Sequence, residues 1–206
     1  MFENDNLEAQ AELFFSKSIN SIEITKAIST FGDVITGKTP PTSISEFYGD
    51  DIPFIKTPDM HHSVYVTTSQ CYLSKKGANS QNNKYIPSNS VIVACIGANA
   101  GEVALTSYVA QTNQQINAVI TDYPCFLYFS IKTHTDELRS LGDGSSTMLN
   151  INKSSFENYA IPTPNTDSLQ LLENRLKTYF DIILSNSKEI DVLNGLKALM
   201  IAQLSR

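Results

Sequence analysis

Polar side chains able to hydrogen-bond to bases or to hold phosphates recur in the predicted loops of this chain. They carry amide, hydroxyl, imidazole and cationic groups, the groups that contact base edges and phosphates in nucleic-acid complexes. The candidate binding residues are Lys38, Thr39, Lys56, Thr57, His61, Lys75, Lys76, Asn99, Gln111, Ser145 and Ser146. Turns favour the same residue types, so each loop taken alone also has a purely structural interpretation.

The charge of the chain limits how such loops can act. The formal net charge is −6 and the isoelectric point about 5.0, which excludes a protein that coats nucleic acid through a broad excess of cations. Between Ile52 and Gln115, however, lysines outnumber acidic residues. We therefore expect a local basic surface, in which Lys38, Lys56, Lys75 and Lys76 anchor phosphates.

Motifs for several kinds of catalysis are missing from the sequence. The only adjacent prolines follow Thr39, so the Asn/Asp-Pro-Pro-aromatic motif of an amino-methyltransferase is absent. No lysine has an acidic residue two positions before it, as a metal-dependent nuclease would require, and no glycine-rich loop leads into Lys-Ser/Thr. The histidines His61, His62 and His134 lack companions for a zinc site or a triad. We predict a non-catalytic chain without a bound metal.

Cysteine usage and hydropathy indicate the compartment. The three cysteines form no C-x-x-C pair and lie in apolar runs, which favours free thiols in a reducing cytoplasm. The acidic start has no basic segment, and no apolar run approaches the ~18 residues of a membrane span. We expect a cytoplasmic protein with neither a signal peptide nor a membrane contact.

Short β-branched or aromatic runs separated by turn residues predict a sheet between Ser21 and Pro164. The expected strands are Ile52–Lys56, Cys71–Ser74, Ser90–Gly97, Glu102–Thr106, Ile116–Thr121 and Asn158–Ile161. The expected short helices are Ala27–Ile35, Lys75–Ser80 and Pro124–Leu141. This pattern predicts an α/β (α+β) domain with a curved mixed sheet.

A long helix is predicted from Asp167 to Ser205, after two prolines that end the preceding strand. Its apolar residues recur every three or four positions over about five heptads, as in a coiled coil. This seam contains Leu169, Leu172, Leu176, Tyr179, Ile183, Asn186, Ile190, Leu193 and Met200. At ~1.5 Å per residue the helix is on the order of 55–60 Å long, so we expect the seam to bind a partner outside its own domain.

A shorter amphipathic helix is predicted over residues 5–19, and the nearest matching apolar surface is the seam of the long helix, in its own chain or in a partner. The predicted organisation is therefore an N-terminal helix (1–20), a globular domain (21–165) and a long helix (166–206).

The order of the loop motifs resembles a known family. The motifs are Gly37–Pro40, Tyr48–Ile55, Asp59, Ile86–Val93 leading to Gly97, Thr112–Ala118, Gly144–Ser146, and Ile161–Pro164 before a long helix that contains Gln170. This series resembles the target recognition domain and conserved helix of specificity subunits of type I restriction–modification systems. The segment Asn6–Phe14 resembles the distal end of such a helix.

The resemblance implies a DNA sequence-recognition subunit that serves modification and restriction subunits. Family members usually carry two recognition domains and two long helices, whereas this chain has one domain and one complete long helix, as in a half-subunit. We therefore expect a homodimer on double-stranded DNA that binds methyltransferase subunits and, indirectly, a translocating nuclease. S-adenosylmethionine and ATP would belong to those partners.

The resemblance also divides the polar residues by role. Asn113 and Gln114 lie within a motif shared across the family, and proteins that read different sequences should not share their reading residues. We assign these two to scaffold or phosphate contacts. The expected base readers are Thr57, His61, Asn99, Gln111 and Ser146.

Two other interpretations remain open from the sequence. One is a coiled-coil adaptor whose globular domain binds a protein or glycan while its polar loops are merely solvated. The other is a silent cassette that exchanges recognition domains by recombination. Salt-dependent binding to duplex DNA separates the first from a DNA-reading subunit, because only DNA binding releases counterions.

Overall fold

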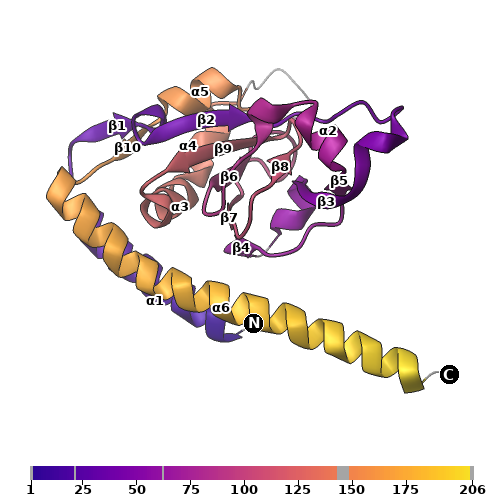
Figure 1. The fold of residues 1–206 in the computed structure, drawn as a ribbon. Coiled ribbons are helices and arrows are strands. Elements are labelled where there is room, and N and C mark those ends of the chain that lie inside the picture. The colour runs from indigo at the N-terminus through magenta and orange to yellow at the C-terminus, as the bar shows by residue number, and fades with distance from the viewer. Residues whose placement is uncertain (1, 21, 62, 143–148, 205–206) are drawn as a thin grey trace.

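A five-stranded mixed sheet forms the centre of the protein, and a long helical arm runs beside it (Figure 1). The computed structural model describes residues 2–20, 22–61, 63–142 and 149–204. The strands are β1 (Thr25–Ala27), β2 (Gly32–Thr36), β3 (Tyr48–Ile55), β4 (Tyr65–Val66), β5 (Tyr72–Leu73), β6 (Val91–Ala94), β7 (Val103–Thr106), β8 (Gln111–Thr112), β9 (Ile116–Thr121) and β10 (Ala160–Pro162). The α-helices are α1 (Phe2–Ile19), α2 (Lys75–Asn79), α3 (Pro124–Thr133), α4 (Thr135–Ser140), α5 (Lys153–Asn158) and α6 (Thr166–Leu204). Short 3-10 helices are η1 (Ile28–Thr30), η2 (Ser45–Phe47), η3 (Thr57–Met60) and η4 (Asn82–Lys84).

The strands form three sheets. The central sheet has the order β2-β9-β6-β7-β4, in which β4 runs parallel to β7 and the other neighbours are antiparallel. A second sheet has the order β5-β3-β8, with β3 antiparallel to β5 and parallel to β8. The third is the pair β1-β10. The prediction of an α+β domain with a curved mixed sheet is confirmed.

Strand β6 shows how the central sheet is covered on both faces. Val91 and Val93 belong to the core shared with α1, α3 and α6, whereas Ile92 and Ala94 belong to a second core on the opposite face. Successive side chains of a strand point to opposite faces, so an uninterrupted apolar run is buried on both sides. Ile55 at the end of β3 helps to fill the second core.

Most of the elements expected from the sequence are present. The six expected strands correspond to β3, β5, β6, β7, β9 and β10, and the helix expected near Lys75 is α2. The helix expected over Ala27–Ile35 is wrong, because this segment forms η1 and then β2, which pairs with β9 along its whole length. Tertiary strand pairing overrides a weak local preference here.

The helix expected over Pro124–Leu141 is divided at His134 into α3 and α4. Three side chains there bond to carbonyls of the preceding turn: Thr133 Oγ1 to Phe129 at 2.8 Å, His134 Nδ1 to Ser130 at 2.8 Å and Thr135 Oγ1 to Lys132 at 3.0 Å. Such side chains compete with the helical backbone for the same acceptors. The local sequence Thr-His-Thr therefore accounts for the break.

Helix α6 has 39 residues and is about 58 Å long. Helix α1 packs along its first half, and the last turns of α6 extend beyond the N-terminus of α1 (Figure 1). Near that end, Asn4 Nδ2 donates to Ser187 Oγ at 3.2 Å and Asn186 Nδ2 donates to Asn4 Oδ1 at 2.9 Å. No helix in the described ranges is long and apolar enough to cross a membrane.

The seam of α6 has two parts, and the expectation that all of it faces an outside partner is wrong. In the first part, α1, α3 and the sheet of the same chain pack against the seam and cover it. The buried residues of this part are Leu169, Leu172, Leu176, Phe180 and Ile183, and the partly buried ones are Tyr179 and Asn186. In the second part the apolar side chains are exposed; they are Ile190, Val192, Leu193, Leu196, Leu199, Met200, Ile201 and Leu204. We call this second part, residues 190–204, the exposed seam.

A buried carboxylate joins α6 to α3. Glu173 is 4% exposed and accepts the backbone N–H groups of Cys125 at 3.1 Å and Phe126 at 2.8 Å. These N–H groups belong to the first turn of α3, where the helix itself offers no acceptor and where a negative charge is favoured. Burial raises the pKa of the Glu173 carboxyl, although the hydrogen bonds from Phe126 and Cys125 oppose the shift. Glu173 thus caps a helix far from it in the sequence.

Replacing Glu173 tests this cap. Glu173→Leu leaves two buried N–H groups without an acceptor, so we expect the free energy of unfolding to fall by about 2–6 kcal/mol. Urea denaturation followed by circular dichroism measures it. Gln170→Leu, an exposed position one turn earlier on α6, is the matched control and should change stability by no more than about 0.5 kcal/mol. Equal losses in the two variants would contradict the capping role.

Candidate nucleic-acid interface

Four strand ends meet at one edge of the two larger sheets. Strands β2 and β6 both run antiparallel to β9, so they end on the same side. Strands β3 and β8 are parallel, with Ile55 opposite Thr112. The Lys38 N–H donates to the Thr112 carbonyl at 2.9 Å, which joins the two sheets at this edge. The Cys95 N–H donates to the Gln115 carbonyl at 2.7 Å, which continues the pairing of β6 with β9 to the same edge. We call the segments that leave it, residues 37–39, 56–61, 95–102 and 113–115, the loop rim.

The first loop of the rim is held tightly by its backbone. A Cβ on Gly37 would lie 2.2 Å from both the Asn113 carbonyl oxygen and Thr112 Oγ1, so only glycine fits there. Thr39 Oγ1 lies 2.6 Å from Gln114 Oε1 and donates to it, while the Lys38 side chain is exposed. The loop therefore presents the exposed Lys38 side chain on a fixed backbone.

Gln111, an expected base reader, does not face solvent. Its side chain is fully buried, and its amide nitrogen donates to the Ala78 carbonyl at 2.9 Å while its oxygen accepts from Gln81 Nε2 at 2.8 Å. Gln81 Nε2 also donates to the Lys38 carbonyl at 2.8 Å. The expectation for Gln111 overlooked the burial of β8, and the pair Gln81–Gln111 instead supports the Lys38 loop from inside.

The shared motif residues behave differently from each other. Asn113 is 8% exposed; it donates to Gln115 Oε1 at 3.0 Å and accepts from the Gln115 N–H at 3.2 Å, which shapes the turn before β9. This arrangement agrees with a scaffold role. Gln114 is exposed and meets the Lys38 loop through Thr39. The exposed position of Gln114 suits a contact with phosphate as well as a scaffold role.

The second loop of the rim follows β3. The ammonium of Lys56 donates to Cys71 Sγ at 3.0 Å and lies 6.0 Å from the centre of the Phe54 ring, so it is directed back over the protein. The Lys56 N–H donates to Asp59 Oδ2 at 2.9 Å, which starts η3 and leaves the Thr57 side chain partly exposed beside it. Asp59, which sequence reasoning placed only within a motif, therefore shapes this loop.

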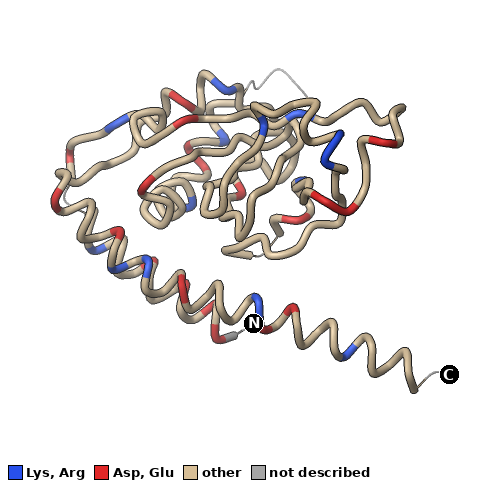
Figure 2. The backbone as a smooth tube through the Cα atoms, viewed as in Figure 1, with Lys and Arg blue, Asp and Glu red and all other residues tan. Residues whose placement is uncertain are grey.

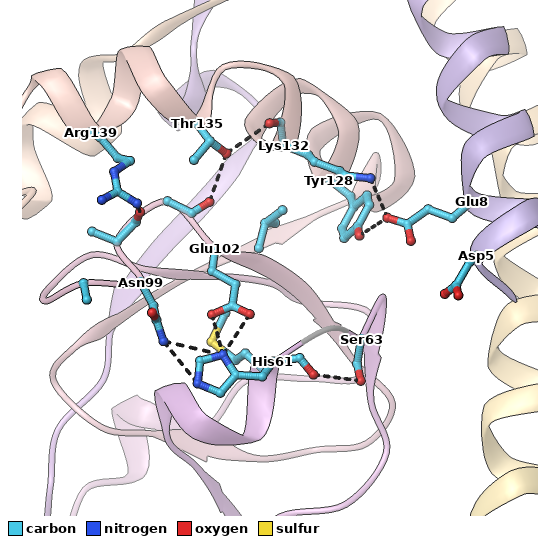
Figure 3. Close-up of a pocket in the computed structure, with 15 residues that line it drawn as sticks. Asp5, Glu8, His61, Ser63, Asn99, Glu102, Tyr128, Lys132, Thr135 and Arg139 are labelled. Carbon is cyan, nitrogen blue, oxygen red and sulfur yellow. Dashed lines mark hydrogen bonds and ion pairs between the residues drawn. The ribbon is translucent and has the colours of Figure 1, made fainter. Parts of the chain in front are cut away.

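The second and third loops meet through His61 and Asn99. The His61 Nδ1 atom lies 3.1 Å from Glu102 Oε1 and 3.0 Å from Glu102 Oε2, and Asn99 Nδ2 lies 3.1 Å from His61 Nε2 (Figure 3). Glu102 was missed by sequence reasoning because nothing in the sequence places it beside the loop after β3. Two of the expected base readers are therefore in contact with each other.

A cleft of about 710 Å³ opens beside this contact, with α1 forming its opposite wall (Figure 3). From α1, Glu8 accepts from Tyr128 at 2.6 Å and from Lys132 at 2.8 Å, and Glu12 also accepts from Lys132 at 2.7 Å. Burial alone would lower the pKa of the Lys132 ammonium, but the hydrogen bonds to Glu12 and Glu8 outweigh it and raise the pKa. Two carboxylates thus surround one ammonium, which makes this wall unfavourable for phosphate.

The expected group of four lysines is not brought together. Lys75 and Lys76 begin α2, beyond the start of β3, where the Lys75 N–H bonds to Asp51 at 3.1 Å and the Lys76 ammonium pairs with Glu46. Figure 2 shows cationic and acidic residues interspersed along the backbone. Lys84, absent from the expected set, donates to the Thr36 carbonyl at 2.9 Å and places a cation where β2 enters the rim.

Ser145 and Ser146 lie outside the residues that the structure describes. The segment that follows them is placed beside the rim, since the Gly97 N–H donates to the Leu149 carbonyl at 2.9 Å and Ile96 pairs with Asn150. Within the described ranges, no group of three His, Cys, Asp or Glu side chains is arranged to hold a metal ion.

Comparison with known families agrees with this arrangement. Residues 23–194 match the sequence profile of the type I restriction modification DNA specificity domain. This chain belongs to that family. The match includes the sheets, the loop rim and the first part of α6, so the specificity domain is the unit described above.

The curated relatives of this specificity domain are longer proteins. The HindI type I restriction enzyme specificity subunit of Haemophilus influenzae is 44% identical over 184 residues, which are 87% of this chain and 40% of that protein. The MjaIX specificity subunit of Methanocaldococcus jannaschii is 27% identical over 172 residues, 80% of this chain and 39% of that protein. The chain thus spans about two fifths of the length of these relatives.

Solved structures show the same fold. The HsdS subunit of Thermoanaerobacter tengcongensis superposes with a TM-score of 0.60 at 14% identity, over 89% of this chain and 46% of that one. The type I restriction-modification S subunit of M. genitalium gives a TM-score of 0.59 at 16% identity, over 87% of this chain and 45% of that one.

The buried role of Gln111 leads to a prediction about stability. Gln111→Leu removes the donor to the Ala78 carbonyl and the acceptor for Gln81, so we expect the free energy of unfolding to fall by about 1–3 kcal/mol. Chemical denaturation measures it, with the exposed Gln114→Leu as the matched control. If Gln111→Leu kept wild-type stability but lost selectivity among DNA sequences, Gln111 would belong with the base readers after all.

Proposed function

We propose that this chain is the DNA sequence-recognition part of a type I restriction–modification specificity subunit. The observation that carries the proposal is the match of residues 23–194 to the DNA specificity domain family. The name of the Haemophilus influenzae relative, at 44% identity, supports it. The loop rim is the surface that we assign to DNA, because polar side chains from four separate segments converge there on rigid strand ends.

The proposed division of labour follows the chemistry of the rim. Lys38 contacts a phosphate, since its exposed ammonium stands on a fixed loop, and Thr39 and Gln114 add neutral hydrogen-bonding groups beside it. Thr57 and Asn99 supply side chains for base edges. Lys75 and Lys76 contact only a longer stretch of DNA that passes α2, because they lie away from the rim.

Catalysis is proposed to reside in other subunits. The chain carries sequence recognition, while methyltransferase subunits bring S-adenosylmethionine and a restriction subunit brings ATP-dependent translocation and cleavage. This division fits a cytoplasmic complex in which the acidic specificity chain receives phosphate contacts from its partners as well as from its own few cations.

A homodimer is proposed to replace the second recognition domain. The exposed seam contains eight large apolar residues, with Leu196 52% and Leu204 86% exposed. A contiguous apolar stripe of this kind is unusual on a monomer. An antiparallel pairing of two exposed seams would bury both stripes and place the two recognition domains at opposite ends.

Sedimentation tests the homodimer. The purified chain should sediment at twice its mass of 22.7 kDa at micromolar concentration, and Leu193→Asp should shift it to the monomer because it places a carboxylate within the apolar contact. Asn194→Asp, which adds the same carboxylate at an adjacent polar position, is the matched control and should leave the dimer intact. A wild-type chain that remains monomeric without its partners would reject self-association.

Ile183 is unsuitable for the same test. Its side chain is 1% exposed within its own chain, so Ile183→Asp would unfold the contact between α6 and the domain rather than separate two subunits.

The salt dependence of DNA binding tests the role of Lys38. In a complex with the methyltransferase subunits, Lys38→Gln should weaken binding to all duplex sequences alike. It should also reduce the slope of log K against log salt by roughly one, because one phosphate contact is lost. Lys26→Gln, an exposed lysine on β1, is the matched control. Wild-type binding without any salt dependence would instead favour a protein-binding adaptor.

A further inference from the structure

We propose that Asn99 reads one adenine of the target sequence and that His61 and Glu102 are positioning residues that orient its amide. The inference rests on the proposed DNA-recognition function and deepens it. It changes the role of His61, which sequence reasoning placed among the base readers, and it adds Glu102, which no motif contained.

Glu102 determines which ring nitrogen of His61 carries the proton. Its carboxylate lies at 3.1 and 3.0 Å from His61 Nδ1, and a carboxylate can only accept a hydrogen bond. The proton of a neutral imidazole therefore sits on Nδ1, which leaves Nε2 as an acceptor. The tautomer of His61 is assigned from this network.

His61 in turn contacts Asn99. Asn99 Nδ2 lies 3.1 Å from His61 Nε2 and 3.5 Å from His61 Nδ1 (Figure 3). Because Nδ1 carries the proton, Nε2 is the ring nitrogen that can accept from the Asn99 amide. The same network assigns the amide orientation, with nitrogen toward the ring and oxygen away from it. The chain Glu102–His61–Asn99 thus allows one arrangement of donors and acceptors.

The backbone of the loop also holds Asn99 in place. The Ala100 N–H donates to the Gly97 carbonyl at 3.2 Å and the Glu102 N–H to the Asn99 carbonyl at 3.0 Å. Gly97 and Gly101 have φ of +95° and +91°, the left-handed region that glycine favours. A Cβ on Gly101 would lie 2.6 Å from Thr135 Cγ2, so this end of the loop packs closely against α4.

The Asn99 amide has an acceptor and a donor left that match the hydrogen-bonding groups of adenine. Asn99 keeps its Oδ1 atom and one N–H that make no hydrogen bond within the described part of the chain, and its side chain is partly exposed. An asparagine amide that accepts from adenine N6 and donates to adenine N7 makes the bidentate contact typical of adenine readout in the major groove. His61 has its ring nitrogens directed at Glu102 and Asn99, which suits orientation rather than reading.

The test is a selection of binding sites by the specificity chain in complex with its methyltransferase subunits, from a pool of duplex oligonucleotides with random sequence. The wild type defines a preferred sequence position by position. Asn99→Ala should lose discrimination at one A·T pair by about tenfold or more and keep it elsewhere. Asn82→Ala, an exposed amide outside the loop rim, should keep discrimination at that same pair.

Two further variants test the positioning role. Glu102→Ala should relax the same A·T pair as Asn99→Ala, and the double variant should relax it no further than Asn99→Ala alone, because both changes remove one interaction. Glu102→Gln, whose side-chain oxygen can still accept from His61, should restore most of the discrimination. Thermal unfolding of each variant confirms that the fold persists.

The outcomes distinguish the inference from the function beneath it. If the wild-type complex selects no sequence, the proposed function fails. If the wild type selects a sequence and Asn99→Ala keeps full discrimination, the assignment of Asn99 is overturned. If Asn99→Ala relaxes an A·T pair but Glu102→Ala relaxes a different one, or the two losses add, His61 and Glu102 do not position Asn99.

Discussion

Burial of Phe180 among aromatic rings of the domain determines where the rest of the molecule lies. Its ring centre is 5.5 Å from Phe129 and 5.3 Å from Tyr128 on α3, and 6.2 Å from Tyr65 on the edge strand β4. Edge-to-face aromatic contacts of this kind are directional as well as apolar. Glu173, two turns earlier on α6, also bonds to α3. Glu173 and Phe180 together hold the long helix against the domain. The direction of the helix is therefore fixed relative to the direction in which the loop rim faces.

Much of the architecture follows from periodicity. The 3.5-residue seam predicted α6 to within a residue or two, and the apolar runs of β6 and β9 predicted the central strands. Periodicity could not show that α1 and the domain cover the first part of the seam, because a seam looks the same whether its partner is inside or outside the chain. It also could not find β2, whose strand form depends on pairing with β9, more than 80 residues later.

The site was predictable in composition but not in accessibility. Four of the loops that the sequence marked as polar meet at the rim, because β2, β3, β6 and β8 end there, whereas Lys75 and Lys76 lie elsewhere. The sequence could not distinguish Gln111 from Asn99. The Gln111 amide makes its hydrogen bonds inside the protein, whereas the Asn99 amide faces a neighbouring loop. Nor could it place Glu102 against His61, since that contact joins residues 41 positions apart.

The frame of the rim and its exposed side chains are different sets of atoms. Gly37, Gln81, Gln111 and Asn113 support the loops through buried amides and backbone contacts, while Lys38, Thr57 and Asn99 project from them. Mutations in the second set leave the strand pairing untouched. Replacement of an exposed side chain can therefore change what the rim contacts while the buried residues that shape its loops stay the same.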